Sequence, residues 1–343
     1  MPISFPASPT SNQTYSYGNR TYRWTGTAWE FVSSGGGGLN WSAAPASASA
    51  TGTAGQIAYD GDFFYVATAA NTWERAALST WTPVASIAGL QLWLDASAPE
   101  TLFDATTGGS LVAADGAVAR WQDKSGNARH MTQATSGSRP LRKTAVQGGR
   151  DVLRFDGSND FMSIASSTAT FSFLHAANST VFAVVKRTGG TSGAFLNNSN
   201  GGGTSHNGSS YNILNGSGTN DRVVHNIFRG QSGTSACGNS SANGSVANAF
   251  SAFSFVGRPT NGTASLRSAM RINAGGVISN NTDTLSAGTG DAYTNLSVAT
   301  DNWNVDQGFC GCDIAEIIIY DTALSDADRS AVEQYLISKW SIT

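Results

Sequence analysis

The feature that most constrains the fold is a succession of short apolar segments, separated by turn-forming residues, through residues 83–343. Many of these segments alternate apolar with polar residues, as strands do in a sheet with one wet face. Roughly a dozen such segments in one stretch are typical of two sheets packed as a sandwich. The clearest candidates are LQLWLD from Leu90, AVARWQD from Ala117, DVLRFDG from Asp151, STVFAVVKR from Ser179, RVVHNIF from Arg222, FSAFSFVGR from Phe250, SLRSAMRIN from Ser265 and DIAEIIIYD from Asp313. We therefore expect an all-β fold with one large β-sandwich over residues 83–343.

One helix is predicted close to the last of these strands. Ser325 followed by Asp328 resembles a capping box, and acidic residues are favourable at the positive end of a helix. Helical spacing then relates Ala331, Val332, Tyr335, Leu336 and Trp340. We expect this helix to pack on the sandwich beside the EIIIY strand.

Residues 186–249 differ from the rest of this stretch because they are poor in apolar residues and dense in Gly, Asn and Ser. We expect long loops there. Core positions are expected for Trp93, Trp121, Phe155 and Trp340.

Composition narrows the class of protein. Charged residues make up 13% of the chain, about half of the ~25% typical of globular domains. Apolar residues at 40%, with 10% aromatic, are enough for packed cores. The net charge is −3 with no basic run, which argues against nucleic-acid binding. No apolar run is long enough to span a membrane, no signal peptide is visible, and three cysteines do not form a disulfide framework.

The N-terminal quarter is predicted to hold two small β-modules. Residues 1–34 contain a Pro/Ser-rich arm and an aromatic β-meander, residues 35–38 form a glycine linker, and residues 39–82 form the second module. The pair Trp73-Glu74 follows the pair Trp29-Glu30 by about 44 residues, which suggests a tandem repeat. Modules this small rarely hold a core alone, so we expect partners from other chains and, specifically, a homotrimer.

Two resemblances follow from these motifs. LWLDAS from Leu92, RWQDKSG from Arg120, LRFDGSNDFM from Leu153 and EIIIYDTALSDADRSAVEQYLISKW from Glu316 together resemble a concanavalin A-like, laminin-G-like jelly roll. TYRWTGTAWE from Thr21 and GTAGQIAYDGDFFYVATAANTWERAAL from Gly52 are similar to shaft or attachment modules of bacteriophage tail-fibre and related virion proteins. The first resemblance implies a sandwich that binds carbohydrate or protein ligands through loops at its rim. Fold alone does not establish function.

No catalytic residue is predicted. Some relatives of the jelly roll are glucanases with Glu-x-Asp-x-x-Glu on one strand, and this chain lacks that arrangement. Its glutamates are Glu30, Glu74, Glu100, Glu316 and Glu333. Glu316 lies on an otherwise apolar strand, where we expect either a structural hydrogen bond or a place on the solvent face.

No metal site is predicted either. Cys310 and Cys312, with Cys237 far away, lack the paired spacing of a zinc site, and we interpret them as small buried residues. Asp123 and the run 156–160 have oxygen ligands suited to calcium, but they also suit Asx turns, which we favour. The histidines are scattered without metal or triad spacing: His130, His175, His206 and His225.

A carbohydrate site needs an exposed aromatic ring flanked by short polar groups. Asp301, Asn302 and Trp303 have that composition, with Tyr293 and Asn295 close by in sequence. A second candidate is the segment 206–212, which contains His206, Asn207, Tyr211 and Asn212. Trp303 also suits a core position, because Trp is well buried on average.

These observations favour a phage virion protein, a tail or receptor-binding fibre made in host cytoplasm and acting outside the cell. Its N-terminal region would contact other virion proteins and its sandwich would adhere to a host-surface glycan. Three other classes stay open: a head fibre or decoration protein, a bacterial surface adhesin, and a polysaccharide depolymerase.

Overall fold

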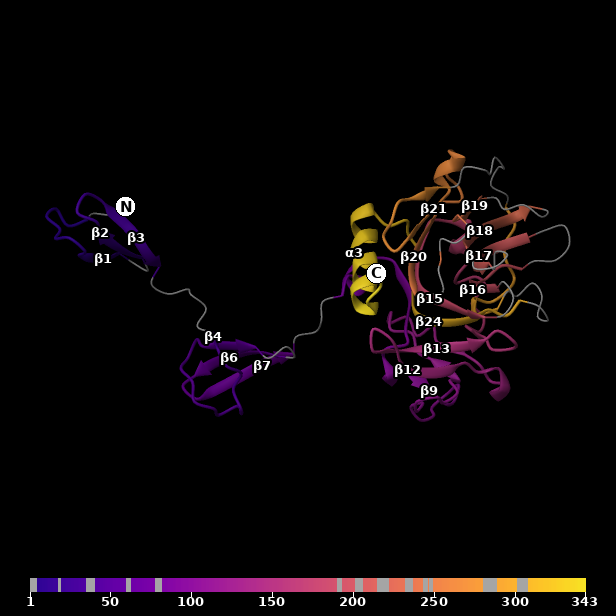
Figure 1. Ribbon diagram of the computed structural model, residues 1–343, viewed down its shortest axis with the longest axis horizontal. Helices are drawn as coiled ribbons and strands as arrows, with labels where there is room; N and C mark the ends of the chain where they lie inside the picture. The colour runs from indigo at the N-terminus through magenta and orange to yellow at the C-terminus, as the bar shows by residue number, and fades with distance from the viewer. Residues whose placement is uncertain are drawn as a thin grey trace. The chain divides into compact units, whose positions relative to one another are not determined.

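The computed structural model describes residues 5–17, 20–34, 41–59, 63–77, 82–189, 193–200, 206–214, 222–231, 237–242, 246, 249–279, 289–300 and 308–343 (Figure 1). The chain divides into two compact units, Met1–Trp81 and Thr82–Thr343. The predicted linker at residues 35–38 lies outside the described residues.

The first N-terminal sheet has an aromatic face. Its antiparallel strands, in spatial order, are β1 (Thr14–Tyr17), β2 (Arg20–Trp24) and β3 (Trp29–Ser34). Tyr15, Tyr22 and Phe31 are register partners, so their side chains share one face. Phe5 packs there, with its ring stacked 5.3 Å from that of Trp29. Every described side chain of this sheet is at least partly exposed, so the aromatic face is not enclosed as a core.

The second N-terminal sheet has a small core of its own. Its strands, in spatial order, are β4 (Trp41–Ser42), β5 (Ile57–Tyr59), β6 (Phe63–Ala69) and β7 (Thr72–Ala77). The β4–β5 pair is parallel, unlike any pair in the first sheet. Tyr65 and Trp73 are buried with Ala58 and Ala67. Gly52 packs so closely on the indole that a Cβ there would lie 2.7 Å from Trp73.

The second unit is an antiparallel β-sandwich, as predicted. One sheet has nine strands, of which β18 and β17, next to one edge, are the longest and the five at the other end have two residues each. In spatial order they are β19 (Cys237–Ser240), β18 (Arg222–Gln231), β17 (His206–Leu214), β16 (Gly193–Asn197), β23 (Ser297–Val298), β14 (Met162–Ser163), β11 (Met131–Thr132), β10 (Arg120–Trp121) and β9 (Leu102–Phe103).

The other sheet has eight strands and is built around the longest apolar segments. In spatial order they are β12 (Leu141–Gln147), β13 (Arg150–Asp156), β24 (Gly311–Tyr320), β15 (Ser179–Gly189), β20 (Ser251–Gly257), β21 (Ser268–Ile272) and β22 (Ile278–Ser279), and β8 (Leu90–Asp95) pairs separately with β24. Strand β24 therefore hydrogen-bonds to β13 at its start, to β8 at its end, and to β15 along its other side.

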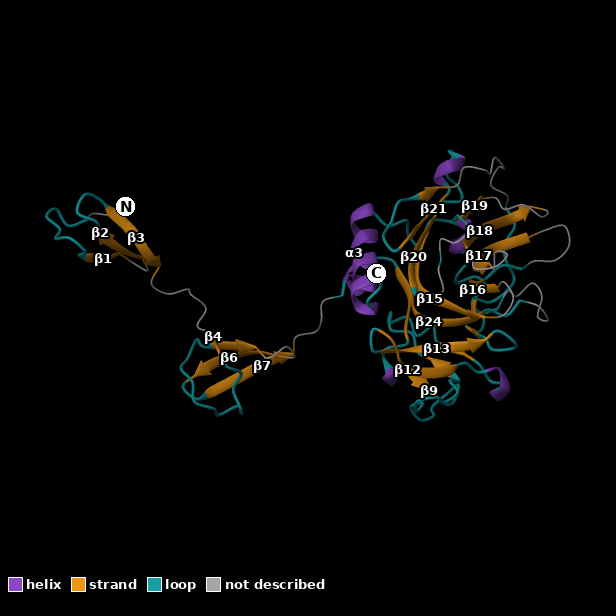
Figure 2. Ribbon diagram, in the orientation of Figure 1, coloured by secondary structure: helices purple, strands orange, loops and turns teal. Residues whose placement is uncertain are grey.

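The predicted helix is present as α3 (Asp326–Trp340) and covers the outer face of the eight-stranded sheet (Figure 2). The Ser325 hydroxyl accepts a hydrogen bond from the Asp328 backbone N–H at 3.1 Å, which caps the first turn. Two helical segments of four residues were not predicted, α1 (Pro83–Ser86) and α2 (Phe173–Ala176). Within the described ranges, three 3₁₀ turns complete the regular structure: Pro99–Thr101, Ser136–Ser138 and Ala264–Leu266.

Two apolar layers result from this arrangement. Between the sheets lie large buried side chains that include Trp121 and Phe155, and beneath α3 lie others that include Trp93 and Trp340. All four were predicted core residues, and this is confirmed. Strand β24 contributes residues to both layers, and all ten of its residues are buried.

The prediction of long loops over residues 186–249 is wrong for most of the described part, which forms β16 to β19. Apolar content averaged over that stretch is low, but the inward positions keep a period of two. Val223, His225 and Ile227 alternate along β18 and are buried, with Tyr211 and Ile213 on β17 beside them. Several outer positions of these strands carry short polar residues, among them Ser210, Asn212 and Asn226, and these lower the apolar content averaged over the stretch.

Candidate functional site

The segment 289–296 leads into β23 and carries two of the predicted site residues. The Tyr293 backbone N–H donates to Oδ1 of Asn200 at 3.2 Å, and the Thr294 hydroxyl donates to the carbonyl of Asn198 at 2.7 Å. Both asparagines follow the end of β16. The segment is therefore fixed to the sandwich through backbone and short polar groups.

The side chain of Tyr293 points to solvent. It is 74% exposed, the largest exposed fraction among the exposed large hydrophobic residues of the described chain. A ring held on an anchored backbone can stack on an apolar ligand face without a large loss of conformational entropy.

Three ionisable side chains hold the start of this segment. Arg229 Nε on β18 donates to the Gly290 carbonyl at 3.0 Å, and its guanidinium lies 3.6 Å from Asp291 Oδ1. His175 Nε2 on α2 lies 3.3 Å from the same carboxylate and accepts from the Ala292 backbone N–H at 3.3 Å. Burial lowers the pKa of His175, so the neutral ring that accepts this N–H is favoured.

Asn295 has a structural contact. Its Oδ1 accepts from the Ser167 backbone N–H at 2.9 Å, and the Ser167 hydroxyl donates to the Ile164 carbonyl at 2.7 Å. The side-chain oxygen of Asn295 therefore anchors the segment to the chain after β14.

Asp301, Asn302 and Trp303, the other predicted ligand residues, lie outside the described residues. The second predicted segment, 206–212, forms most of β17 rather than a loop. Tyr211 is fully buried there and stacks on His225 with ring centroids 4.5 Å apart, so it offers no ring to a ligand.

The asparagines after β16 were not singled out from the sequence. Asn198 is buried, its Oδ1 accepts from the Ser209 backbone N–H at 2.8 Å, and its Nδ2 donates to the Phe171 carbonyl at 3.1 Å. Such side chains position the Tyr293 segment. The run Asn197-Asn198-Ser199-Asn200 was the available signal, since amides in a row suit this kind of backbone bridging.

The aspartates considered for calcium make Asx turns. Asp156 Oδ1 accepts from the backbone N–H groups of Ser158 and Asn159 at 2.7 and 3.2 Å. Asp123 accepts from the backbone of Trp93 at 3.0 Å and of Ser125 at 2.8 Å. Among the residues that the structure describes, no group of His, Cys, Asp and Glu side chains is placed to hold a metal ion.

The two cysteines near β24 are buried, as the sequence predicts. The Cys312 thiol donates to the Cys310 carbonyl at 3.4 Å, and burial raises the pKa of Cys312 well above its usual value. A thiol in this environment is a packing residue rather than a nucleophile.

Glu316 makes structural hydrogen bonds, which was one of its two expected roles. It is fully buried between β24 and α3, and Asp95 is its register partner on β8. Its carboxylate accepts from Trp93 Nε1 at 2.7 Å, Tyr335 Oη at 3.0 Å, Lys339 Nζ at 2.8 Å and Trp340 Nε1 at 2.7 Å. Burial and the nearby Asp95 raise the pKa of Glu316, and Lys339 opposes them. This side chain is not available to a substrate.

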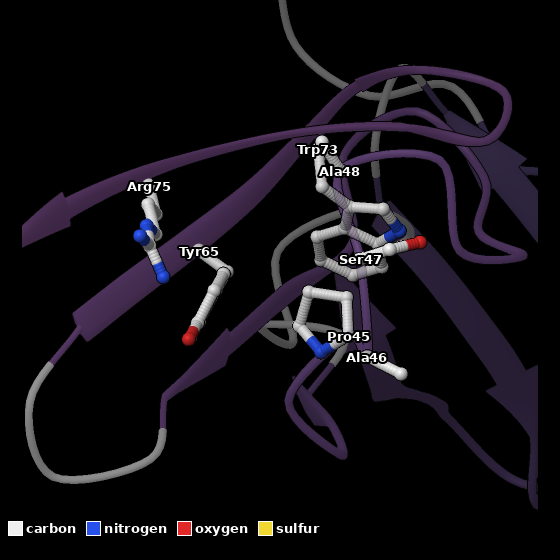
Figure 3. A pocket seen from close by; sticks show the side chains of 7 residues that line it. All are labelled: Pro45, Ala46, Ser47, Ala48, Tyr65, Trp73 and Arg75. Carbon is white, nitrogen blue, oxygen red and sulfur yellow. The ribbon is translucent and has the colours of Figure 1, made fainter.

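A pocket of about 300 Å³ opens in the second N-terminal sheet (Figure 3). Tyr65 and Arg75 line one side, and Trp73 and Pro45 line the other. The guanidinium of Arg75 lies 4.1 Å from the ring centroid of Phe63.

None of the helices in the described ranges combines the length and apolar character needed to cross a membrane. The chain matches no protein-family model. No curated protein matches it either.

Solved structures do resemble it. One is an arabinofuranosidase complexed with arabinofuranosyl-α-1,2-xylobiose, at 15% identity and a TM-score of 0.47 over 77% of this chain and 61% of that one. Another is the CBM40 of the Ruminococcus gnavus IT-sialidase bound to α2,3 sialyllactose, at 14% identity and a TM-score of 0.41 over 55% of this chain and 98% of that one. A third is the binding domain of botulinum neurotoxin DC in complex with SialylT, at 9% identity and a TM-score of 0.41 over 73% of this chain and 52% of that one.

The chain spans less than two thirds of the arabinofuranosidase and of the neurotoxin binding domain, and nearly the whole of the CBM40. The sandwich is established by its own strand order and two apolar layers.

Proposed function

We propose that this chain is a non-enzymatic carbohydrate-binding protein whose sandwich contacts a glycan at the Tyr293 segment. The observation that carries the proposal is a tyrosine ring that is 74% exposed on a backbone held by buried asparagines. An aromatic ring stacks on the C–H face of a sugar, and amides and hydroxyls nearby exchange hydrogen bonds with its hydroxyl groups. Low overall charge suits a ligand that is recognised without ions.

We further propose that the protein acts in a virion, as a tail or receptor-binding fibre, and as a homotrimer. The resemblance of residues 10–80 to fibre modules supports this, together with an aromatic first sheet in which no described side chain is buried. A sheet this small, with no enclosed core, gains stability from further contacts, and other virion proteins or further copies of the chain would supply them. Linking several weak sugar sites in a trimer raises avidity.

A glycan array with the wild-type chain and the Tyr293→Ala variant tests the binding site. Tyr59→Ala is the matched control, since Tyr59 is also an exposed tyrosine, at 61%, in the other unit. We expect the Tyr293 variant to lose most of the array signal and the Tyr59 variant to keep it. Equal signals from all three proteins would refute the site.

Three further experiments address the assembly, the place of action and the absence of catalysis. Light scattering coupled to size exclusion should give three times the monomer mass of 35.5 kDa, and a monomer would refute the trimer. Immunolabelled electron microscopy should place the chain on phage tails, and label on heads would favour a head fibre instead. Incubation of the chain with host polysaccharide should produce no new reducing ends. If new reducing ends appear, the protein is a depolymerase.

A further inference from the structure

The pocket of the second N-terminal sheet contains the module's one basic residue. Arg75 is the only Lys or Arg in residues 41–77 of the sequence. It forms no ion pair with any residue that the structure describes. A cation placed at a pocket, with no carboxylate paired to it among the described residues, is suited to an anionic ligand.

The orientation of Arg75 favours a carboxylate. Its guanidinium carbon lies over the Phe63 ring, 4.1 Å from the ring centroid, which is a cation–π contact. A cation–π contact does not use the N–H groups, and these make no hydrogen bond to any residue that the structure describes. They match the two oxygens of a carboxylate in a bidentate pair.

The rest of the pocket suits a small ring. Trp73 and Pro45 supply apolar surface, and the hydroxyl of Tyr65 points the same way as the guanidinium beside it (Figure 3). A volume of about 300 Å³ is at the small end of ligand pockets, so it suits one sugar ring rather than a chain.

We propose that this pocket binds a carboxylate-bearing sugar residue, with the carboxylate on Arg75 and the ring between Trp73, Pro45 and Tyr65. The site is separate from the Tyr293 segment and does not depend on it. The chain then carries two carbohydrate contacts of different chemistry, a neutral one on the sandwich and an acidic one on the N-terminal module.

The test is an NMR titration of the full-length chain that follows the indole N–H of Trp73, which donates to the Ala50 carbonyl at 3.1 Å. The probes are glucuronate, glucose and acetate. We expect saturable shifts with glucuronate and at least roughly tenfold weaker binding of glucose and of acetate, because each lacks either the charge or the ring. Glucuronate binding should also weaken with added salt.

Variants assign the site. Arg75→Met should weaken glucuronate binding about tenfold or more. Arg75→Lys keeps the charge but loses the bidentate hydrogen bonding of the guanidinium, so its affinity should lie between those of the wild type and Arg75→Met. Arg23→Met on β2 is the matched exposed control and should bind as wild type does. An unshifted Trp73 resonance in the unliganded variants shows that the module is folded.

Three results would overturn the proposal: equal affinity for glucuronate and glucose, equal affinity for acetate and glucuronate, or unchanged affinity in Arg75→Met. Tyr293→Ala distinguishes this site from the sandwich site. It should leave the Trp73 titration unchanged even if the sandwich binds no glycan.

Discussion

Replacing Glu316 by Gln should destabilise the sandwich strongly, although the two side chains have nearly the same size. Both oxygens of the Glu316 carboxylate accept hydrogen bonds from the groups around them. In the Gln variant, an NH₂ group, which can only donate, takes the place of one of these oxygens. On either orientation of the amide, one indole N–H loses its acceptor, that of Trp93 or that of Trp340. Both indoles are buried, so water cannot accept the hydrogen bond of the indole N–H that has lost its partner.

The magnitude follows from those contacts. A buried donor left without a partner costs ~1–3 kcal/mol, and the bond that Lys339 makes to Glu316 weakens as well. Lys339 still forms its ion pair with Asp95 at 2.8 Å in this variant. The loss of stability should therefore be smaller than the ~3–5 kcal/mol that breaking a buried ion pair costs when one charge is left unpaired. We expect Glu316→Gln to lower the free energy of unfolding by about 2–4 kcal/mol.

Urea unfolding followed by near-UV circular dichroism measures this change, since Trp93 and Trp340 report on the layer beneath α3. Glu100→Gln is the matched control. Glu100 is exposed on a 3₁₀ turn, and its replacement should stay within about 0.5 kcal/mol of wild type. If Glu316→Gln also stays within that margin, the network does not contribute as its distances indicate, and the reasoning fails.

Two further predictions concern other parts of the chain. Gly52→Ala should lower the free energy of unfolding of the second N-terminal sheet by about 1–3 kcal/mol, because the new Cβ would lie 2.7 Å from Trp73. Limited proteolysis should then cut that module faster than in the wild type, and an unchanged cleavage rate would contradict this. Burial raises the pKa of Asp160 from 3.8 to about 6. Between these two pH values the native state holds a proton that the unfolded chain releases. The contribution of Asp160 to stability therefore falls as the pH rises from about 4 to about 6. Asp160→Asn should remove that part of the pH dependence in urea titrations from pH 4 to 7, and an unchanged slope would refute the assignment.

The helix and the long strands were predictable because their signals are local. The Ser325 cap and the apolar spacing up to Trp340 specify α3, and the run from Asp313 specifies β24. Local signals also led to the error over residues 186–249, where the composition of a window outweighed the alternation along β17 and β18. The segment AVARWQD contributes only the two residues of β10, since pairing across the sheet decides how much of it becomes strand.

The candidate site was predictable in part. Tyr293 was identified from its type and its neighbours, but its anchors at Asn198 and Asn200 come from a segment nearly a hundred residues earlier. The surroundings of Glu316 show the same limit, because Trp93 reaches it across 223 residues of sequence. No spacing rule in one sequence gives such pairings.

The place of β24 in the chain has a consequence for biosynthesis. Strands β8, β13 and β15 all precede it in sequence, yet each of them pairs with it in the finished sheet. A ribosome must therefore release more than two hundred residues of strand-forming chain before the strand that joins them is made. Until then both apolar layers are open and several strand edges are unpaired, which favours aggregation. We expect truncations before Gly311 to aggregate rather than to form a smaller sandwich.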